Sequence, residues 1–536
     1  MLAHAALFAL AFHPAALWPL AFLCAAPLGR LVGAARLRQA LLGGFAGFLL
    51  GGGAAVHWLA LFGLVPWLAT AFGFGLYGLL FATLARPMAR AGWPALVWLP
   101  LAWVACESLR GRLFFWAFPW FYLGHAVYPL QAVVQVAELG GQLLVSLLVA
   151  AWNGLVLDLW NAWRPPSAPA GARPPARTAW RRLARLGWLP LAATLAAWLY
   201  GAGRLAALTP QSFVRGPEAL AVQPHIPQRL KNATDFDPMR RLRDLERLTR
   251  QHARSGGSPP DLVVWPETML PVWRASDARL PYAAVDQVPE LQRRLAAVLR
   301  EAGARRLIAG SLHAAWDQDR QEPVEHNSAF YLDASGTVLG RYDKMHLAPV
   351  SEYTPLQHTW PAFYRYVREN FTPGFSQFER GRGPVLFELD GFRIAPNVCF
   401  DITFSSAVRL GVLAGADAIV NVSNYAWFED SAELDLARIH GMFRAIETRR
   451  GVLAAVNGGI SHLVDPAGRI YDLVRADGRR KQIEGALRAP LLSSPERTFY
   501  VRYGDWPGLG AVGLAVLGAL AALVAPDRRH RPAARP

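Results

Sequence analysis

The strongest constraint on the fold is the uneven distribution of apolar residues along the 536-residue chain. The first two hundred positions consist largely of Leu, Ala, Gly, Phe and Trp, and Asp and Glu are almost absent there. From about Thr209 to Tyr503 the residues mix charges as soluble domains do. Because a helix needs about 20 apolar residues to cross a hydrocarbon core, the sequence predicts a helical membrane part followed by an aqueous part.

Apolar segments of spanning length recur along the chain. The clearest are Leu41–Phe62, Trp67–Ala85, Trp93–Cys106, Val133–Leu159, Leu186–Ala202 and Leu509–Ala525. The first thirty residues lack the basic start and single cleavage site of a secretory signal, and they predict two short anchoring helices joined at His13 and Pro14. We therefore expect eight spans, with a membrane domain over 1–205, an α/β domain over 206–503, and a last span with a basic tail over 504–536.

Basic residues predict the orientation, because cytoplasmic loops of membrane proteins are rich in Lys and Arg. With a cytoplasmic N-terminus, alternate loops are basic. They contain Arg30, Arg36, Arg38, Arg86, Arg90, Arg164, Arg173, Arg177, Arg181, Arg182 and Arg185, and the tail is basic too. Arg110 and Arg112 are exceptions. The domain before the last span should then lie outside the cytoplasm. We interpret the net charge of +16 as a topology signal and not as nucleic-acid binding, for which no motif is present.

The aqueous part alternates short β-branched runs with helical patterns. Helices are predicted over Asp237–Arg254, Glu290–Ala302, Phe404–Ala414 and Ser431–Arg449, and "DASG" and "DPAG" predict hairpin turns. Strands that alternate with helices and hairpins indicate a layered α/β domain.

Three chemically suited residues end predicted strands of this domain. Glu267 follows "DLVVWP", Lys344 follows "LGRYD", and Cys399 follows "RIAPNV". A carboxylate can take the thiol proton, the thiolate can attack an acyl carbon, and an ammonium can stabilise the oxyanion and lower the thiol pKa. An exposed strand-end acid, a surface lysine and a packed thiol are equally simple interpretations, and composition and periodicity do not decide between them.

The cysteine count adds to this picture. Cys24 and Cys106 lie in apolar segments, where a small buried residue is the ordinary interpretation. Cys399 is the single cysteine of the aqueous part, so that part has no internal disulfide.

Several longer motifs resemble a known family. "DLVVWPET", "YDKMHLAPVSEYTP" and "FRIAPNVCFD" resemble the Glu, Lys and Cys motifs of the nitrilase (carbon-nitrogen hydrolase) superfamily. With its apolar spans, the chain resembles the membrane-anchored apolipoprotein N-acyltransferase family, from near residue 10 to near 525. Matching segments include "LAFHPAALWPLAFL", "ESLRGRLFFWAFPW", "AVQPHIPQRLK" and "NVSNYAWF".

The resemblance implies a nitrilase-like αββα sandwich attached to a multi-span helical membrane domain. It implies Cys399 as nucleophile, Glu267 as general base and Lys344 as oxyanion-stabilising cation. Glu352 and Asp401 would support them, and Gln223, Asn424 and Trp427 would bind substrate.

The implied reaction is ping-pong acyl transfer. A fatty acyl chain passes from a phospholipid to Cys399, and then to the α-amine of the S-diacylglyceryl-cysteine of an apolipoprotein. The implied partners are the phospholipid donor, the diacylated acceptor and membrane lipids, without metal or organic cofactor. The implied location is the bacterial inner membrane, with the catalytic domain on the periplasmic side.

The chain also departs from the family pattern. Phe400 and Asp401 replace the usual Tyr-Glu, Tyr425 an Asp, Glu429 a Gly and Asn232 a Trp, and a Gln-His pair is missing, with only His440 nearby. The aromatic and arginine-rich stretch Thr359–Phe375 is either an amphipathic lid or packed in the domain. Two other functions stay open: a membrane-tethered amidase or acyltransferase acting on another amine, and a binding or transport protein with a silent domain.

Overall fold

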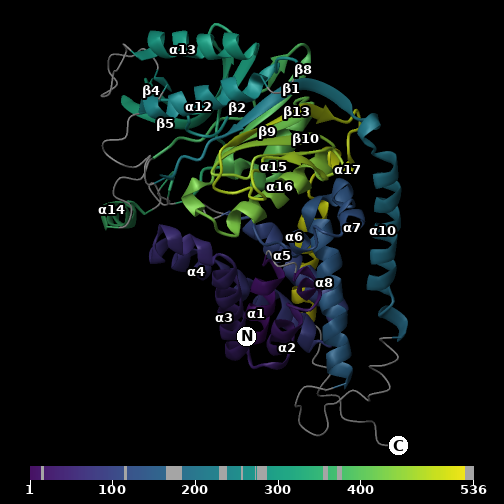
Figure 1. Cartoon of the computed structure of the whole chain (residues 1–536). Helices are drawn as coiled ribbons and strands as arrows, with labels where there is room; N and C mark the ends of the chain where they lie inside the picture. The colour runs from purple at the N-terminus through teal and green to yellow at the C-terminus, as the bar shows by residue number, and fades with distance from the viewer. Residues whose placement is uncertain are drawn as a thin grey trace, which may run out of the picture. The chain divides into compact units, whose positions relative to one another are not determined.

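The computed structural model of the chain divides into two compact units (Figure 1). One consists of Met1–Ala206 with Tyr503–Pro536, and the other of Ala207–Arg502. The structure describes residues 1–13, 17–113, 117–163, 184–228, 238–254, 257–271, 273–274, 287–349, 351–353, 360–370 and 377–524. The predicted bend at Pro14, the loop over 164–183, Asn232, the basic tail and both ends of the predicted lid lie outside these residues.

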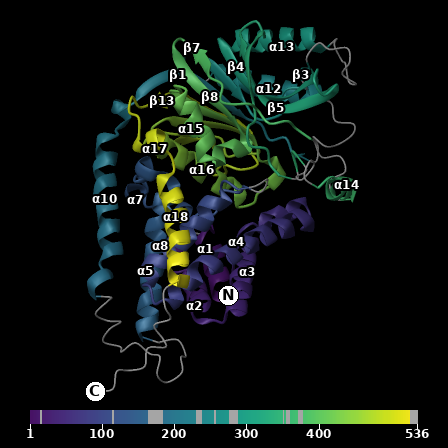
Figure 2. The ribbon, with the colours of Figure 1, turned by 180° about the vertical axis from the view of Figure 1, so that it is seen from behind.

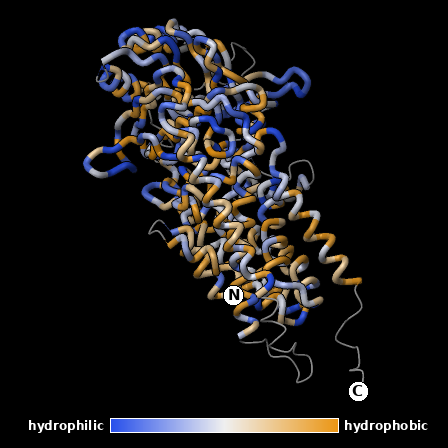
Figure 3. Tube along the Cα trace, turned by 90° about the vertical axis from the view of Figure 1, so that its right-hand side faces the viewer, coloured by the Kyte–Doolittle hydropathy of each residue, from blue (hydrophilic) through white to orange (hydrophobic). Residues whose placement is uncertain are grey.

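The first unit is helical. Its helices are α1 (Leu2–Ala11), α2 (Ala26–Ala34), α3 (Leu37–Ala55), α4 (Leu64–Arg90), α5 (Ala95–Arg110), α6 (Leu123–Ala126), α7 (Gln131–Val134), α8 (Ala137–Trp163), α10 (Leu189–Ala207) and α18 (Trp506–Val524). Each of the six apolar segments expected to span is largely helical. Leu41–Phe62 is divided between α3 and the 3₁₀ helix His57–Phe62, and Val133–Leu159 between α7 and α8. The colouring of Figure 3 shows that the helical unit is mostly hydrophobic, whereas the other unit mixes hydrophilic and hydrophobic residues.

Three helices among the described residues are long and apolar enough to cross a membrane. These are α4, α8 and α18. The shorter apolar helices include Leu2–Ala11 and Trp18–Ala34. The unit is therefore a multi-span helical domain, and the count of eight spans stays a prediction.

Small residues allow close helix contacts in this unit. A β-carbon at Gly44 of α3 would lie 2.4 Å from the carbonyl oxygen of Gly78 in α4, and one at Gly78 would lie 2.1 Å from that of Gly44. Such glycine contacts are typical of helices that pack in membranes. From the far end of the sequence, α18 packs against α4, α5 and α8 (Figure 2).

The two arginines that depart from the charge rule have local partners. Arg110 is 4% exposed and donates hydrogen bonds to the carbonyl oxygens of Phe118 and Trp120. Arg112 forms an ion pair with Asp505 at the start of α18. Both guanidinium groups therefore have hydrogen-bond or ion-pair partners within this unit. These partners explain why two arginines stand on the side predicted to be poor in basic residues.

The second unit is a four-layer αββα sandwich, as expected. The first sheet has the order β13-β1-β2-β4-β5-β6, with β3 beside β4, and the second has the order β12-β11-β10-β9-β8-β7. In Figure 1, α12 (Pro238–Ala253) and α13 (Gln287–Ala302) cover the first sheet, while α15 (Ser405–Leu413) and α16 (Glu433–Thr448) cover the second. All four predicted helices are confirmed.

The strands have the following bounds: β1 (Val214–Gln223), β2 (Leu262–Trp265), β3 (Trp273–Arg274), β4 (Arg306–Asp317), β5 (Glu322–Asp333), β6 (Val338–Asp343), β7 (Phe387–Leu389), β8 (Phe392–Val398), β9 (Ala418–Asn424), β10 (Gly451–Asn457), β11 (His462–Val464), β12 (Ile470–Leu473) and β13 (Gly485–Ser493). In the first sheet β1, β2 and β4 run parallel, as do β8, β9 and β10 in the second. Ligand sites of α/β sheets form at the carboxyl ends of such strands.

The region expected to form a lid contains one described helix, α14 (Pro361–Asn370). Trp360 and Tyr366 are 57% and 56% exposed. These two aromatic side chains are therefore not part of the core of the domain, which argues against the packed alternative for them.

Candidate active site

Glu267 is delivered to the site by the end of a buried strand. All four residues of β2 are buried, and the indole nitrogen of Trp265 donates a hydrogen bond to Thr249 Oγ1 of α12. Pro266 cannot donate to the sheet ladder and ends the strand, and Thr268 turns the chain with φ of 55°. Glu267 itself is 6% exposed. The strand end is thus fixed on both sides of the carboxylate.

Gly310 of β4 permits this turn. A β-carbon at Gly310 would lie 2.4 Å from Glu267 Cα and 2.6 Å from the carbonyl oxygen of Pro266. Only glycine therefore allows the Glu267 backbone to approach the neighbouring strand so closely.

We expect Gly310→Ala to displace Glu267. Overpacking of this kind costs about 1–3 kcal/mol of stability, and a shift of about 1 Å in a reacting group can cost ~10²-fold in rate. Thermal unfolding and an acyl-transfer assay measure the two effects. Gly383→Ala is the matched control, because a β-carbon there has no heavy atom within 4 Å. Equal activity of both variants would contradict this role for Gly310.

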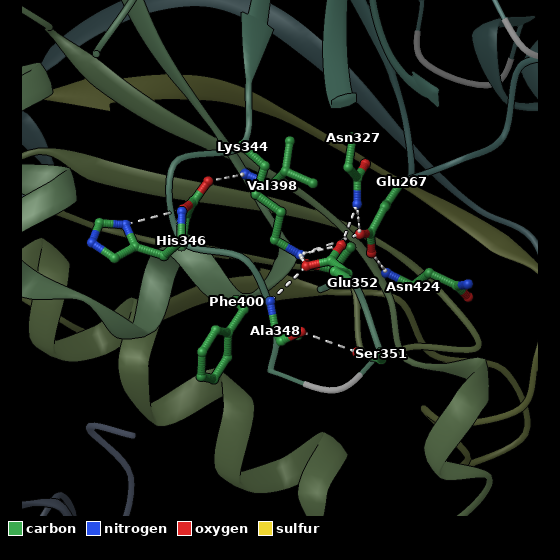
Figure 4. Close-up of polar contacts among 12 residues, drawn as sticks. Glu267, Asn327, Lys344, His346, Ala348, Ser351, Glu352, Val398, Phe400 and Asn424 are labelled. Atoms are coloured by element: carbon green, nitrogen blue, oxygen red, sulfur yellow. Dashed lines mark hydrogen bonds and ion pairs between the residues drawn. The ribbon is translucent and has the colours of Figure 1, made fainter. Parts of the chain in front are cut away.

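Lys344 lies between two carboxylates (Figure 4). Its Nζ is 2.9 Å from Glu352 and 3.6 Å from Glu267 Oε1. The lysine is 1% exposed, and burial opposes its charge, but Glu352, the Cys399 sulfur and Glu267 outweigh burial and raise the Lys344 pKa. Lys344 is therefore charged, and the structure brings the three predicted residues Glu267, Lys344 and Glu352 into one cluster.

Asn327 joins the two acids and was missed by sequence reasoning. Its Nδ2 donates hydrogen bonds of 2.7 Å to both Glu267 Oε1 and Glu352 Oε1. Its carbonyl oxygen accepts from the Lys344 backbone N–H. The one available signal was a polar residue opening the apolar run "NSAFYL" of β5, which is too common to single out.

Glu352 and Glu267 are further held by backbone donors. The Ala348 N–H donates to Glu352 Oε2 at 2.7 Å, and the Asn424 N–H donates to Glu267 Oε2 at 2.8 Å. Asn424 ends β9, so the second sheet helps to orient a residue of the first sheet. Both acids therefore have fixed orientations toward Lys344.

Cys399 occupies a strained turn at the end of β8. It has φ of 51° and begins a short 3₁₀ helix, Cys399–Thr403. Holding a residue other than glycine in this region costs about 1–3 kcal/mol, and such strain clusters at functional sites. Val398 pairs with Val422 of parallel β9, two residues before Asn424. The cysteine thus follows a strand end adjacent to the one that orients Glu267.

The thiol pKa corrects one expectation. Although Cys399 is partly exposed as a residue, burial and the charge of Glu267 raise its pKa well above the ordinary value, and the opposing effect of Lys344 does not reverse the shift. The expected gain in thiolate near neutral pH is therefore wrong for the free protein. The shift favours the protonated thiol, and the charge of Glu267 is one of its causes.

This raised pKa predicts slow alkylation of Cys399 at neutral pH. The thiolate fraction, and with it the iodoacetamide rate, should keep rising with pH beyond pH 9, because thiolate forms only above the raised pKa. In Glu267→Gln the profile should move to lower pH, since a negative charge is lost. Peptide-mapped labelling across pH measures both profiles. A plateau below pH 8 in the unsubstituted protein would refute the raised pKa.

Asp401 connects the cysteine turn to the lysine segment. Its carboxylate accepts hydrogen bonds of 2.7 Å from the Tyr342 hydroxyl and from the His346 N–H, which flank Lys344 on either side. It also accepts from the Val398 N–H at 3.4 Å. Asp401 is fully buried. We infer that its hydrogen bonds fix where Lys344 lies relative to Cys399.

The predicted substrate-binding residues have different surroundings. Gln223 is fully buried, and its amide donates to the Ile483 carbonyl oxygen and accepts from the Ser461 N–H, so the hydrogen bonds of this amide hold the framework. The Asn424 side chain bonds to Gln228 and Asn457. Trp427 is half-buried in the 3₁₀ helix Ala426–Phe428.

The sequence departures also have structural counterparts. Phe400 packs edge-on against Phe404 with centroids 5.2 Å apart. Tyr425 is 7% exposed and lies close enough to Cys399 for the thiolate charge to add to the effect of burial in raising the tyrosine pKa. Glu429 has φ of 49°, a conformation that suits the glycine it replaces.

The arrangement suits acyl transfer through a covalent intermediate. It combines a thiol, a fixed carboxylate and a buried ammonium, the kinds of group that such chemistry uses as nucleophile, proton acceptor and oxyanion charge partner. Within the described ranges, no group of three His, Cys, Asp or Glu residues could hold a metal ion.

Fold and site together define a membrane-attached member of the carbon-nitrogen hydrolase class. Residues 220–482 match the family model described as carbon-nitrogen hydrolase, and residues 4–155 match the apolipoprotein N-acyltransferase N-terminal domain. The apolipoprotein N-acyltransferase of Geobacter metallireducens is 30% identical over 531 residues, which cover 96% of this chain and 93% of that one. The chain belongs to the apolipoprotein N-acyltransferase family.

A second sequence relative agrees with this assignment. The apolipoprotein N-acyltransferase of Bordetella bronchiseptica is 31% identical over 453 residues, covering 80% of this chain and 73% of that one. Among solved structures, an amidase from Nesterenkonia sp. is 18% identical with a TM-score of 0.36, and the match covers 54% of this chain and 95% of that one. With its apolar helices, the chain is a membrane protein of the nitrilase superfamily.

Proposed function

We propose that the protein transfers a fatty acyl chain from a phospholipid to the N-terminal α-amine of S-diacylglyceryl-cysteine in apolipoproteins. The observation that carries this proposal is the buried Lys344 ammonium between Glu267 and Glu352, whose charges act on a strained Cys399. Membership of the family supports the choice of reaction. The residues Glu267, Lys344 and Cys399 are assigned as catalytic on this basis.

The first half-reaction forms a thioester. Glu267 takes the Cys399 proton while the sulfur attacks the ester carbonyl carbon, and the oxyanion that forms is stabilised by the Lys344 charge. The C–O bond of the ester then breaks, and the departing oxygen takes the proton from Glu267. A lysophospholipid leaves, and the acyl chain stays on sulfur.

The second half-reaction consumes the thioester. The nitrogen of a neutral α-amine attacks the carbonyl carbon, Lys344 again faces the oxyanion, and the C–S bond breaks. The amine gives up one proton, which returns to the Cys399 sulfur through Glu267. The carboxylate must therefore act as acid and base in turn, which the fixed hydrogen bonds from Asn327 and Asn424 permit without moving it.

We further propose that the protein lies in the bacterial inner membrane with several spans and that the α/β unit is on the periplasmic side. The arginine distribution supports this orientation, and both proposed substrates carry acyl chains that prefer a hydrocarbon environment.

The alternative is a membrane-tethered amidase or acyltransferase that acts on another amine. Mass spectrometry of lipoprotein N-termini, in cells that depend on this protein and then lose it, separates the two. The proposal predicts a triacylated N-terminus that falls back to the diacyl form on depletion. Finding only diacyl lipoproteins while the protein is present would reject it.

A further inference from the structure

Glu433 is a buried carboxyl group that the proposed reaction does not use. It is the first residue of α16 and is 1% exposed. Its Oε2 is buried without a hydrogen-bond partner among the described residues. Such a group is costly to bury unless it is neutral or receives a partner on binding.

Basic side chains lie near Glu433 but form ion pairs with its neighbour Asp435. Asp435 is 2.7 Å from Lys481 and 2.8 Å from Arg480, whereas no described Lys or Arg forms an ion pair with Glu433. Lys481 also donates to the Ser431 carbonyl oxygen at 2.9 Å. Lys481 and Arg480 are thus both paired with Asp435. The Glu433 carboxyl keeps an oxygen, Oε2, without a hydrogen-bond donor among the described residues.

Glu433 lies on a helix that packs against the segment carrying the sulfur, because α16 contacts the 3₁₀ helix Cys399–Thr403. The charge of Glu433 acts on both the Cys399 thiol and the Tyr425 hydroxyl, and Tyr425 is itself close to Cys399. Burial raises the Glu433 pKa well above the ordinary value, although Lys481 opposes this. Burial therefore favours the neutral form of Glu433 in the free protein.

We propose that Glu433 receives a primary ammonium group of a substrate beside Cys399. The inference rests on the proposed function and names which substrate group this part of the site recognises. The acyl ester and the phosphate of a phospholipid carry acceptors and negative charge, so an ammonium is the substrate group that matches an unpaired carboxyl. That ammonium belongs either to the acceptor α-amine or to an ethanolamine headgroup of the donor.

The acceptor amine reacts in the following order. The carboxyl loses its proton to solvent as the ammonium arrives, and an ion pair forms. The ammonium then returns one proton to Glu433, and the neutral nitrogen attacks the thioester. The C–S bond breaks, the second proton reaches the sulfur through Glu267, and the amide keeps the third. A carboxylate with a raised pKa suits this task because it is the stronger base.

The test is Glu433→Gln, which keeps the shape of the neutral acid but cannot form the ion pair. Three arms are measured on the full-length protein in detergent: Cys399 acylation by dioleoyl phosphatidylglycerol, which has no amine, acylation by dioleoyl phosphatidylethanolamine, and transfer from the preformed thioester to an S-diacylglyceryl-cysteine peptide. Glu433→Asp tests rescue by the charge, and Asp435→Asn is the matched control on the same helical turn.

A selective fall of about 30-fold or more in kcat/KM is expected where the ammonium is bound, which is the usual size when one partner of a buried charge pair is removed. A fall confined to transfer identifies the acceptor amine, and one confined to the phosphatidylethanolamine arm identifies the headgroup. Glu433→Asp should recover part of it. Unchanged rates in all arms, or an equal fall in all three, overturn the inference. If the unsubstituted protein accepts no acyl chain from either donor, the proposed function itself fails.

Discussion

Cys399→Ala is expected to abolish acyl transfer, with turnover reduced about a thousandfold or more. Removing an attacking nucleophile can cost up to ~10⁶ in kcat in a covalent mechanism. The turn at φ of 51° holds alanine at the same strain as cysteine, because both carry a β-carbon, so the fold should persist. Transfer of a fluorescent acyl chain from phospholipid to a diacylglyceryl peptide measures the loss.

Cys106→Ala is the control for this loss. Cys106 is 1% exposed in α5 of the helical unit, and its substitution should leave transfer active. A Cys399→Ala protein that folds and keeps full turnover would exclude every thiol-based account of this site, whatever the control shows.

Glu267→Gln should have the second largest effect, about 10²- to 10⁴-fold on the rate of thioester formation, the usual contribution of a general base. The side chain keeps its size, and its amide oxygen can still accept from the Asn424 N–H. Lys344 keeps Glu352 as its partner at 2.9 Å, so the cluster should remain folded. Single-turnover labelling of Cys399 by fluorescent phospholipid isolates this step.

The control is Glu301→Gln on the surface of the same unit, where the acid pairs with Arg250. We expect normal labelling, because surface ion pairs contribute little. The contrary result is a Glu267→Gln protein whose Cys399 is acylated at the unsubstituted rate while its alkylation profile still moves to lower pH. Glu267 would then only raise the thiol pKa, and another group would take the thiol proton.

Much of the fold could be predicted because it is encoded locally. The apolar segments and the strand-ending motifs carry their own signals, and the four helices of the α/β unit lie within three residues of the predicted ends. The convergence of Glu267, Lys344 and Glu352 came only from the resemblance, because it depends on sheet order. Asn327 and Gly310 escaped notice since their roles lie in contacts with residues distant in sequence.

The pKa of Cys399 was harder to predict from the sequence than the location of the site residues. From the sequence, a cation is expected near Cys399, and with it a lower thiol pKa. The sequence alone does not show how the effect of Lys344 compares with burial and the charges of three nearby acids, which together raise the thiol pKa. The unpaired Glu433 also has no sequence signature, because its neighbours Asp430 and Asp435 give the segment an ordinary acidic surface pattern.

The direct test of the central claim is the mass of the peptide that contains "NVCFD" after incubation with phospholipid and without acceptor. The account predicts one added fatty acyl group on Cys399, removed by hydroxylamine and lost when the diacylglyceryl peptide is supplied. An unmodified Cys399 peptide in a preparation that completes the full transfer at its normal rate would contradict it.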